Sequence, residues 1–247
     1  MKKEKGDDVY EFTDMFEKSD TVEIDTLRKL AYHEAGHFVM NALLRRVPFT
    51  IEVSLFFPSP KSMWVSEDSH SGQVEGVGLP IYSRWSDSDS GNQFIDGLFS
   101  WPNPYSLNTK LAVANVFLSV AGFASEFSFV RPDRAISSFG SEKGEHPDRK
   151  NAQKLLGLIL RREIDDRIEK EKAHSELLGL LIAEVKEIFN AEKVSEAIHQ
   201  VADLLMKREL DQKGNRVISG DELNRLSQKI MEEVDEYDLQ VRLNKYG

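Results

Sequence analysis

The sequence predicts a mainly α-helical protein with a small β-sheet, and three observations support this fold class. Apolar residues recur at helical spacing over 27–46, and the pattern is again helical almost throughout the chain after Pro104. Only two short segments, 51–55 and 72–78, alternate polar and apolar residues as half-buried strands do. We therefore expect helices to build the core and a small sheet to lie beside them.

The composition predicts a folded protein without thiol chemistry. The chain has 247 residues, of which 40% are hydrophobic, so it can bury a substantial core. It has no cysteine, which excludes disulfides, iron–sulfur ligation, thiolate zinc sites and cysteine nucleophiles. This composition suits a reducing soluble compartment, and we expect a cytoplasmic location. The net charge of −10 argues against nucleic acid or an anionic membrane surface as a partner.

One domain is predicted over 25–235, flanked by two short segments. Residues 1–24 are polar and have no clear period, so we expect an N-terminal arm, and 236–247 are expected to form a C-terminal tail. The stretch 56–105 is rich in proline, serine and aspartate and is predicted to be an insertion. Neither a secretory signal nor a membrane span is predicted, because the most apolar stretch, 111–124, falls short of the roughly 20 residues that a span needs.

Local signals place the helices along the chain. Asp25 and Thr26 can cap the first helix, and Pro48 ends it. Pro147 suits the first turn of a later helix. The apolar stripe of the first helix consists of Leu27, Leu30, Ala31, Ala35, Phe38, Val39 and Ala42. Further helices are predicted over 107–129, 148–171, 175–190, 193–210 and 221–239.

The most informative segment is His33-Glu34-Ala35-Gly36-His37, inside the first predicted helix. His33 and His37 are four residues apart, so their side chains lie one turn apart on the same face and can both bind one zinc ion. Glu34 projects beside them, where it can act as the general base that removes a proton from a zinc-bound water. Gly36 costs about 1 kcal/mol inside a helix, which indicates a close backbone approach.

A third zinc ligand must come from another part of the chain, and the spacing leaves several candidates. A metzincin is excluded, because it would need Gly and His at the positions of Met40 and Leu43. Glu126, on a later predicted helix, could serve as in an ordinary gluzincin. Asp148, in the first turn of the helix that follows Pro147, and His146 close to it are the other candidates.

Three segments carry a more specific resemblance: Ala31 to His37, Ala121 to Phe127, and Pro147 to Ala152. The first looks like the protease motif of the FtsH family, the membrane-anchored AAA zinc proteases. The second resembles that family's Gly-Gly-Arg-Ala-Ala-Glu-Glu segment, and the third its Asn-Asp-Leu-x-x-Ala-Thr segment. The resemblance covers roughly 25–230 and implies a zincin-like helical metalloprotease fold with Asp148 as the third zinc ligand.

Two features of this family have no counterpart in the sequence. The phosphate-binding pattern Gly-x-x-x-x-Gly-Lys-Ser/Thr does not occur, and neither do the membrane segments. Phe123 stands where the second segment of the family has arginine. We therefore expect no ATPase activity and no ATP-driven unfolding from this chain alone.

These observations predict a soluble zinc-dependent metallopeptidase that hydrolyses peptide bonds in unfolded or extended polypeptides. His33, His37 and Asp148 are expected to bind Zn²⁺, and Glu34 is expected to be the general base. Two alternatives remain on the same fold: a non-proteolytic interaction module and a zinc hydrolase of non-peptide amides. The resemblance further implies two kinds of protein partner, a ring-like homo-oligomer or a separate ATPase chain.

A candidate substrate-binding strand lies between the two halves of the site in the sequence. It falls where FtsH-like proteases place an edge strand beside the zinc, and such a strand could pair with an extended substrate backbone. An ordinary hairpin strand is the alternative interpretation. The strand comprises Gln73, Val74, Glu75, Gly76 and Val77.

Overall fold

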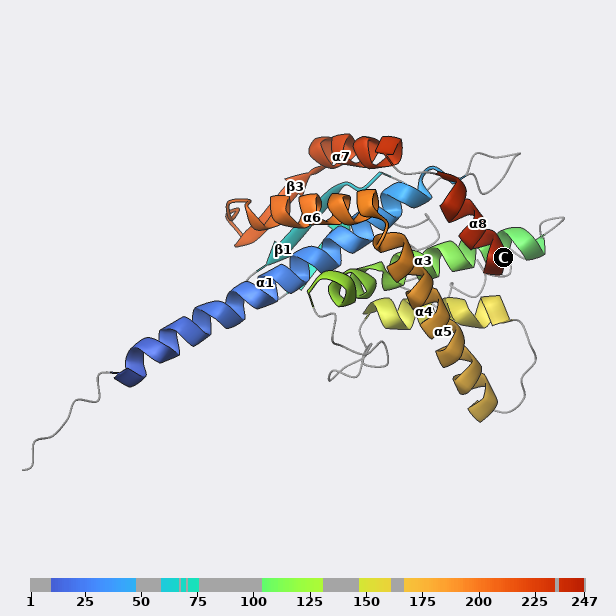
Figure 1. Ribbon diagram of the computed structural model, residues 1–247, viewed down its shortest axis with the longest axis horizontal. Helices are drawn as coiled ribbons and strands as arrows, with labels where there is room; N and C mark the ends of the chain where they lie inside the picture. The colour runs from blue at the N-terminus through green and yellow to red at the C-terminus, as the bar shows by residue number, and fades with distance from the viewer. Residues whose placement is uncertain are drawn as a thin grey trace, which may run out of the picture.

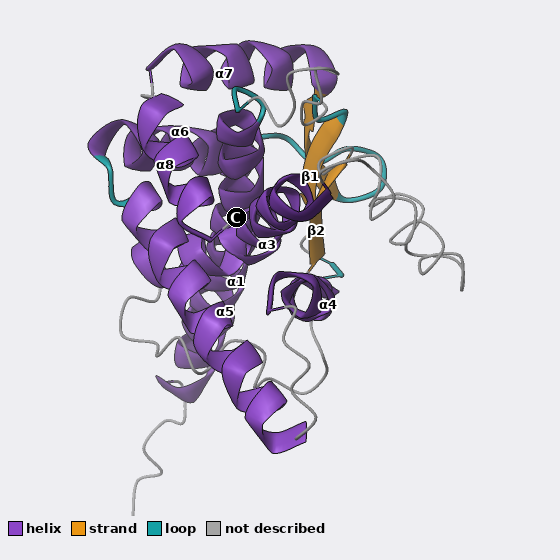
Figure 2. Ribbon diagram, turned by 90° about the vertical axis from the view of Figure 1, so that its right-hand side faces the viewer, coloured by secondary structure: helices purple, strands orange, loops and turns teal. Residues whose placement is uncertain are grey.

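The computed structural model describes residues 10–47, 59–66, 68–69, 71–75, 104–130, 147–160, 167–233 and 236–246. In these residues it contains seven helices and a three-stranded antiparallel sheet, which confirms the mainly α fold class with a small sheet. The C-terminal part of the long first helix lies among the other helices, and its N-terminal part extends away from them (Figure 1). The sheet lies on one side of the helices (Figure 2).

The first helix, α1 (Tyr10–Leu44), is longer than the sequence predicts. Its predicted start near 27 is wrong, and the expected N-terminal arm belongs to this helix from Tyr10 onward. No proline or glycine occurs between Tyr10 and Gly36, so nothing in the sequence stops the helix there. Asp25 and Thr26 consequently lie inside α1 and do not cap it.

The second long helix, α3 (Pro104–Phe129), packs along α1. A Cβ atom on Gly36 would lie 2.5 Å from the carbonyl oxygen of Ala121 and 2.7 Å from Ser125 Cβ. Only glycine therefore permits this approach of the two helices, which confirms the close backbone contact expected at Gly36. In α3 the segment Lys110–Phe129 is apolar and long enough to cross a membrane, but 89% of its most apolar window is buried in the protein.

The C-terminal half is helical as predicted, with different boundaries. The predicted helix 148–171 corresponds to α4 (Pro147–Leu160) and to the beginning of α5 (Arg167–Phe189), and α6 spans Glu192–Met206. The predicted last helix is in fact two helices, α7 (Gly220–Glu233) and α8 (Glu236–Tyr246).

The segment expected to be a C-terminal tail contributes to the core. α8 buries Leu239 and Leu243. On its polar side, Arg242 and Tyr246 donate hydrogen bonds to the buried carboxylate of Glu184 in α5, at 2.6 and 2.9 Å. Apolar burial and charge-assisted hydrogen bonds therefore both attach α8 to the rest of the fold.

The sheet has the strand order β2-β1-β3, with both pairings antiparallel. β1 (Ser62–Ser66) and β2 (Ser71–Glu75) lie within 56–105, so part of the predicted insertion belongs to the sheet. β3 (Asn215–Ser219) was not predicted from the sequence. The predicted strand 51–55 lies outside the described residues. Across the sheet Met63 is paired with Val74 and with Ile218, and all three are buried.

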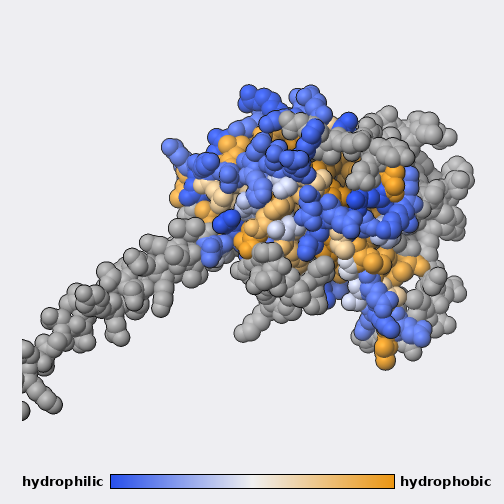
Figure 3. All heavy atoms as spheres, in the orientation of Figure 1, coloured by the Kyte–Doolittle hydropathy of each residue, from blue (hydrophilic) through white to orange (hydrophobic). Residues whose placement is uncertain are grey.

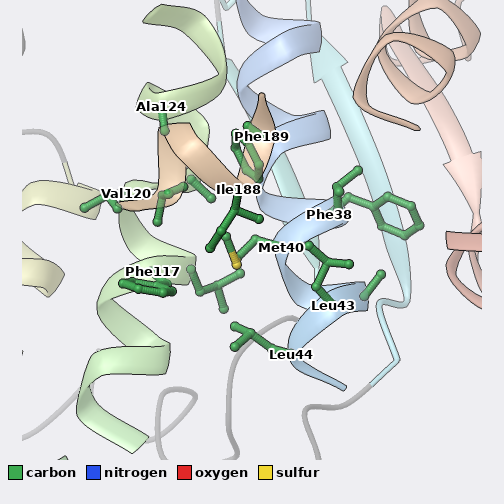
Figure 4. Close-up of a cluster of buried hydrophobic side chains, with 14 of the residues drawn as sticks. Phe38, Met40, Leu43, Leu44, Phe117, Val120, Ala124, Ile188 and Phe189 are labelled. Carbon is green, nitrogen blue, oxygen red and sulfur yellow. The ribbon is translucent and has the colours of Figure 1, made fainter. Parts of the chain in front are cut away.

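The hydrophobic core lies mainly between α1, α3 and the helices that follow them. Figure 4 shows part of it, where side chains from α1, α3 and α5 meet. The face of the molecule in Figure 3 mixes hydrophilic residues with smaller apolar areas. The labelled core residues are Phe38, Met40, Leu43, Leu44, Phe117, Val120, Ala124, Ile188 and Phe189.

Candidate metal centre

The two histidines of the motif lie one turn apart in α1 and are buried. His33 is 6% exposed and His37 is 9% exposed, and their ring centroids are 4.8 Å apart. This arrangement follows from the four-residue spacing, which stacks the side chains on one face of a helix. Both rings face α3, the helix that packs along this part of α1.

α3 fixes the orientation of both rings through hydrogen bonds at their Nδ1 atoms. His33 Nδ1 donates to Glu126 Oε1 over 2.6 Å, and His37 Nδ1 donates to the carbonyl oxygen of Leu118 over 2.8 Å. A carboxylate and a carbonyl only accept hydrogen bonds, so each neutral ring carries its proton on Nδ1. The Nε2 atom of each ring therefore has a lone pair available for a metal ion.

Asp148 completes a compact group of three ligand atoms. It lies in the first turn of α4. Its Oδ2 atom is 3.1 Å from His33 Nε2 and 3.2 Å from His37 Nε2, and the two Nε2 atoms are 3.1 Å apart. His33, His37 and Asp148 could thus hold a metal ion, as the sequence predicts.

The dimensions of this triangle fit a tetrahedral ion such as zinc. Zinc binds histidine nitrogen and carboxylate oxygen at about 2.0–2.2 Å. Atoms 3.1–3.2 Å apart at that distance from a common ion subtend about 100° there, close to the tetrahedral angle of about 109°. Three protein ligands would leave the fourth position of the ion open, which is the arrangement of catalytic rather than structural zinc sites.

The electrostatics of the group also favour a bound cation. Burial by itself lowers the pKa of His33, but its hydrogen bonds with Asp148 and Glu126 outweigh this effect and raise the pKa to about 10. Burial likewise lowers the pKa of His37, and the charge and hydrogen bond of Asp148 raise it above its ordinary value. The surrounding carboxylates therefore stabilise positive charge at this position, either a proton or a metal ion.

Glu34 lies next to the ligand group and against the sheet. It is 5% exposed and follows His33 directly in α1. A Cβ atom on Gly72 of β2 would lie 2.8 Å from both Cγ and Oε1 of Glu34. The glycine therefore makes room for the carboxylate of Glu34 beside the backbone of β2.

The predicted substrate strand is described only in part. Gln73, Val74 and Glu75 are in β2, whereas Gly76 and Val77 lie outside the described residues. β2 pairs with β1 on one side and is an edge of the described sheet. It contacts α1, the helix that carries the motif.

The other two ligand candidates differ in their positions. Glu126 is 3% exposed and lies behind His33, on the Nδ1 side of the ring, so it orients a ligand and is not itself part of the triangle. Carboxylates in this position support metal-binding histidines in many proteins. His146 lies outside the described residues.

Sequence reasoning did not assign a role in the site to Gly122 or Phe123, which both contact His33. A Cβ atom on Gly122 would clash with His33, lying 2.6 Å from its Cδ2 and Cε1 atoms and closer still to Nε2. Phe123 packs edge-on against the same ring, with centroids 5.0 Å apart and planes at 79°. The available signal was a glycine inside an otherwise apolar, alanine-rich helix, because such a glycine usually has a packing reason.

Comparison with known proteins does not identify a family. Neither protein-family models nor curated proteins give a significant match to the chain. The functional argument therefore depends on the geometry of the metal centre and on the sequence resemblance described above.

Proposed function

We propose that this chain is a zinc-dependent metallopeptidase of the FtsH type, and that it hydrolyses peptide bonds in unfolded or extended polypeptides. A reducing soluble compartment, such as the cytoplasm, suits a catalytic chain without cysteine. The observation that carries the proposal is the convergence of His33, His37 and Asp148 beside the buried carboxylate of Glu34.

His33, His37 and Asp148 would hold the ion, with Glu126 and the Leu118 carbonyl orienting the two rings from behind. The chemistry that zinc supplies in such a site is Lewis acidity, which makes water a nucleophile near neutral pH. Glu34 would accept the proton of the attacking water and return it to the leaving amine. Its position next to the candidate ligands would place its carboxylate near a peptide bound at the metal.

The edge of β2 would position the substrate. An extended peptide can add to a sheet edge through main-chain hydrogen bonds, and this binding mode tolerates many side chains. Because Gly72 lies against Glu34, a peptide paired with β2 would bring its backbone close to the general base. This edge of the described sheet thus supports an unfolded polypeptide as the substrate. The chain could assemble into a homo-oligomeric ring, or a separate ATPase chain could deliver the substrate.

The experiment that tests this proposal separates metal binding from catalysis. Purified chain should hold about one zinc ion, and both His33→Ala and Asp148→Ala should lose it. Glu34→Gln should retain zinc, because Glu34 is not a ligand, but should cleave casein about 10²–10⁴-fold more slowly.

The possible results distinguish the alternatives. A wild type that binds zinc and cleaves small amides but not casein would be a hydrolase of non-peptide amides. A wild type that binds zinc and cleaves neither would favour the interaction module. Equal casein cleavage by Glu34→Gln and wild type would show that the proposed mechanism is wrong.

A further inference from the structure

Lys29 is linked to the metal centre through Glu126. It precedes His33 by one helical turn in α1, so both side chains lie on the same side of the helix. Lys29 Nζ is 3.7 Å from Glu126 Oε2, and the other oxygen of this carboxylate accepts the hydrogen bond from His33 Nδ1. One carboxylate thus contacts a cation on one side and a ligand histidine on the other.

The different burial of Glu126 and Lys29 indicates that the carboxylate of Glu126 needs the positive charge of Lys29 more than the reverse. The side chain of Glu126 is 4% exposed, whereas that of Lys29 is 23% exposed. A buried carboxylate is costly unless it is paired, and it lies in a region that also contains Glu34 and Asp148. The ammonium group of Lys29 compensates the negative charge, and its own partial exposure limits the cost of burying it.

We propose that Lys29 is a positioning residue of the metal centre, which holds the Glu126 carboxylate in the orientation that fixes the His33 ring. Glu126 has two oxygens, and Lys29 engages the one that His33 does not use. Lys29 thereby favours the rotamer of Glu126 that keeps His33 Nε2 directed at the ligand triangle. This inference rests on the metal site of the proposed function and does not depend on peptidase activity.

The test measures metal affinity of the full chain by competition with a chromophoric chelator for Zn²⁺. Loss of a residue that directly supports a metal-binding histidine typically costs 10–100-fold in affinity, so Lys29→Met, one contact further away, should cost about 3–10-fold. Lys29→Arg keeps the positive charge and should bind zinc close to the wild-type level. Co²⁺ absorption, which reports coordination geometry, should change in Lys29→Met and be restored in Lys29→Arg.

A matched control separates this effect from the general loss of a surface lysine. Lys172 in α5 is paired with Glu176 at 3.9 Å, and its side chain is 76% exposed. Lys172→Met should leave zinc affinity unchanged. Circular dichroism of every variant should show the wild-type helix content.

A double-mutant cycle tests whether Lys29 acts through Glu126. Glu126→Gln can still accept the hydrogen bond from His33 but lacks the charge that pairs with Lys29. In that background Lys29→Met should have no further effect on zinc affinity. Equal or tighter zinc binding by Lys29→Met in the wild-type background would overturn the inference, as would an undiminished effect in Glu126→Gln. A wild-type chain that binds no zinc would instead refute the metal site itself, and the inference with it.

Discussion

Replacement of Gly122 by alanine should damage the metal centre without touching any ligand. The added Cβ atom would lie 2.6 Å from His33 Cδ2 and Cε1, whereas ordinary contacts between such atoms are 3.4–4 Å. To restore contact distance to these carbons, the ring and α3 must move apart by at least about 0.8 Å, and more for the nearer Nε2 atom. The ring has little freedom to do so, because Glu126 and Phe123 hold it on other sides.

The size of this displacement determines the expected effect. Metal–ligand distances in a functional site are kept within about 0.2 Å, so a shift of about 0.8 Å removes His33 Nε2 from good ligand geometry. We expect Gly122→Ala to weaken zinc binding by at least about 100-fold, the upper range for loss of a supporting residue. Overpacking of the α1–α3 interface should also cost about 1–3 kcal/mol, partly offset by the higher helix propensity of alanine.

Zinc competition titration and thermal unfolding with and without zinc measure both effects. Gly179 in α5 offers a matched control, because a Cβ atom there would have no neighbour within 4 Å. Gly179→Ala should keep zinc affinity and raise the stability by up to about 1 kcal/mol. If Gly122→Ala binds zinc as tightly as wild type and melts at the same temperature, the placement of His33 against α3 is wrong.

Two further predictions concern the general base and the proton balance of the site. Gly72→Ala should retain zinc but lose most peptidase activity, because the new Cβ atom would displace the side chain of Glu34. Loss of zinc in this variant would contradict the separate roles of Glu34 and the candidate metal ligands. In metal-free protein the pKa of His33 is raised from 6.5 to about 10. Protonation of His33 therefore stabilises the fold fully below pH 6.5, and this stabilisation is lost as the pH rises towards 10. Zinc must displace this proton, so zinc affinity should increase with pH across the same range. Calorimetric titration in buffers of different ionisation heat should detect proton release, and pH-independent affinity would contradict it.

Local signals predict the positions of His33, His37 and Asp148 on their helices, whereas the choice of Asp148 as the third candidate ligand came from the family resemblance. His33 and His37 are fixed on one face by helix periodicity alone, and Pro147 marks the helix start that places Asp148 in the first turn of α4. The competition between Asp148 and Glu126 was not decided by spacing, since both lie on helices that could reach α1. Only the packing of α3 shows that Glu126 approaches the Nδ1 side of His33.

The features that sequence reasoning missed depend on contacts between distant segments. β1 has a short apolar run in which Trp64 follows Met63, so no alternation marks it as a strand. β3 buries only Ile218, and its pairing with β1 joins residues far apart in the chain. Similarly, Gly72 and Gly122 are informative only when Glu34 and His33 are known to lie against them.

The origin of the ligands connects metal binding to the assembly of the helices. α1 carries two of the candidate ligands on one rigid element, whereas the third lies on α4, which packs against α3 and buries Ala152 and Leu156. An ion held by His33, His37 and Asp148 would join α1 directly to α4. Because the unfolded chain cannot bring these ligands together, binding free energy at this site is also folding free energy. The glycines and the Lys29–Glu126 pair would act on the same equilibrium, since they would decide how well the candidate ligands are arranged before an ion binds.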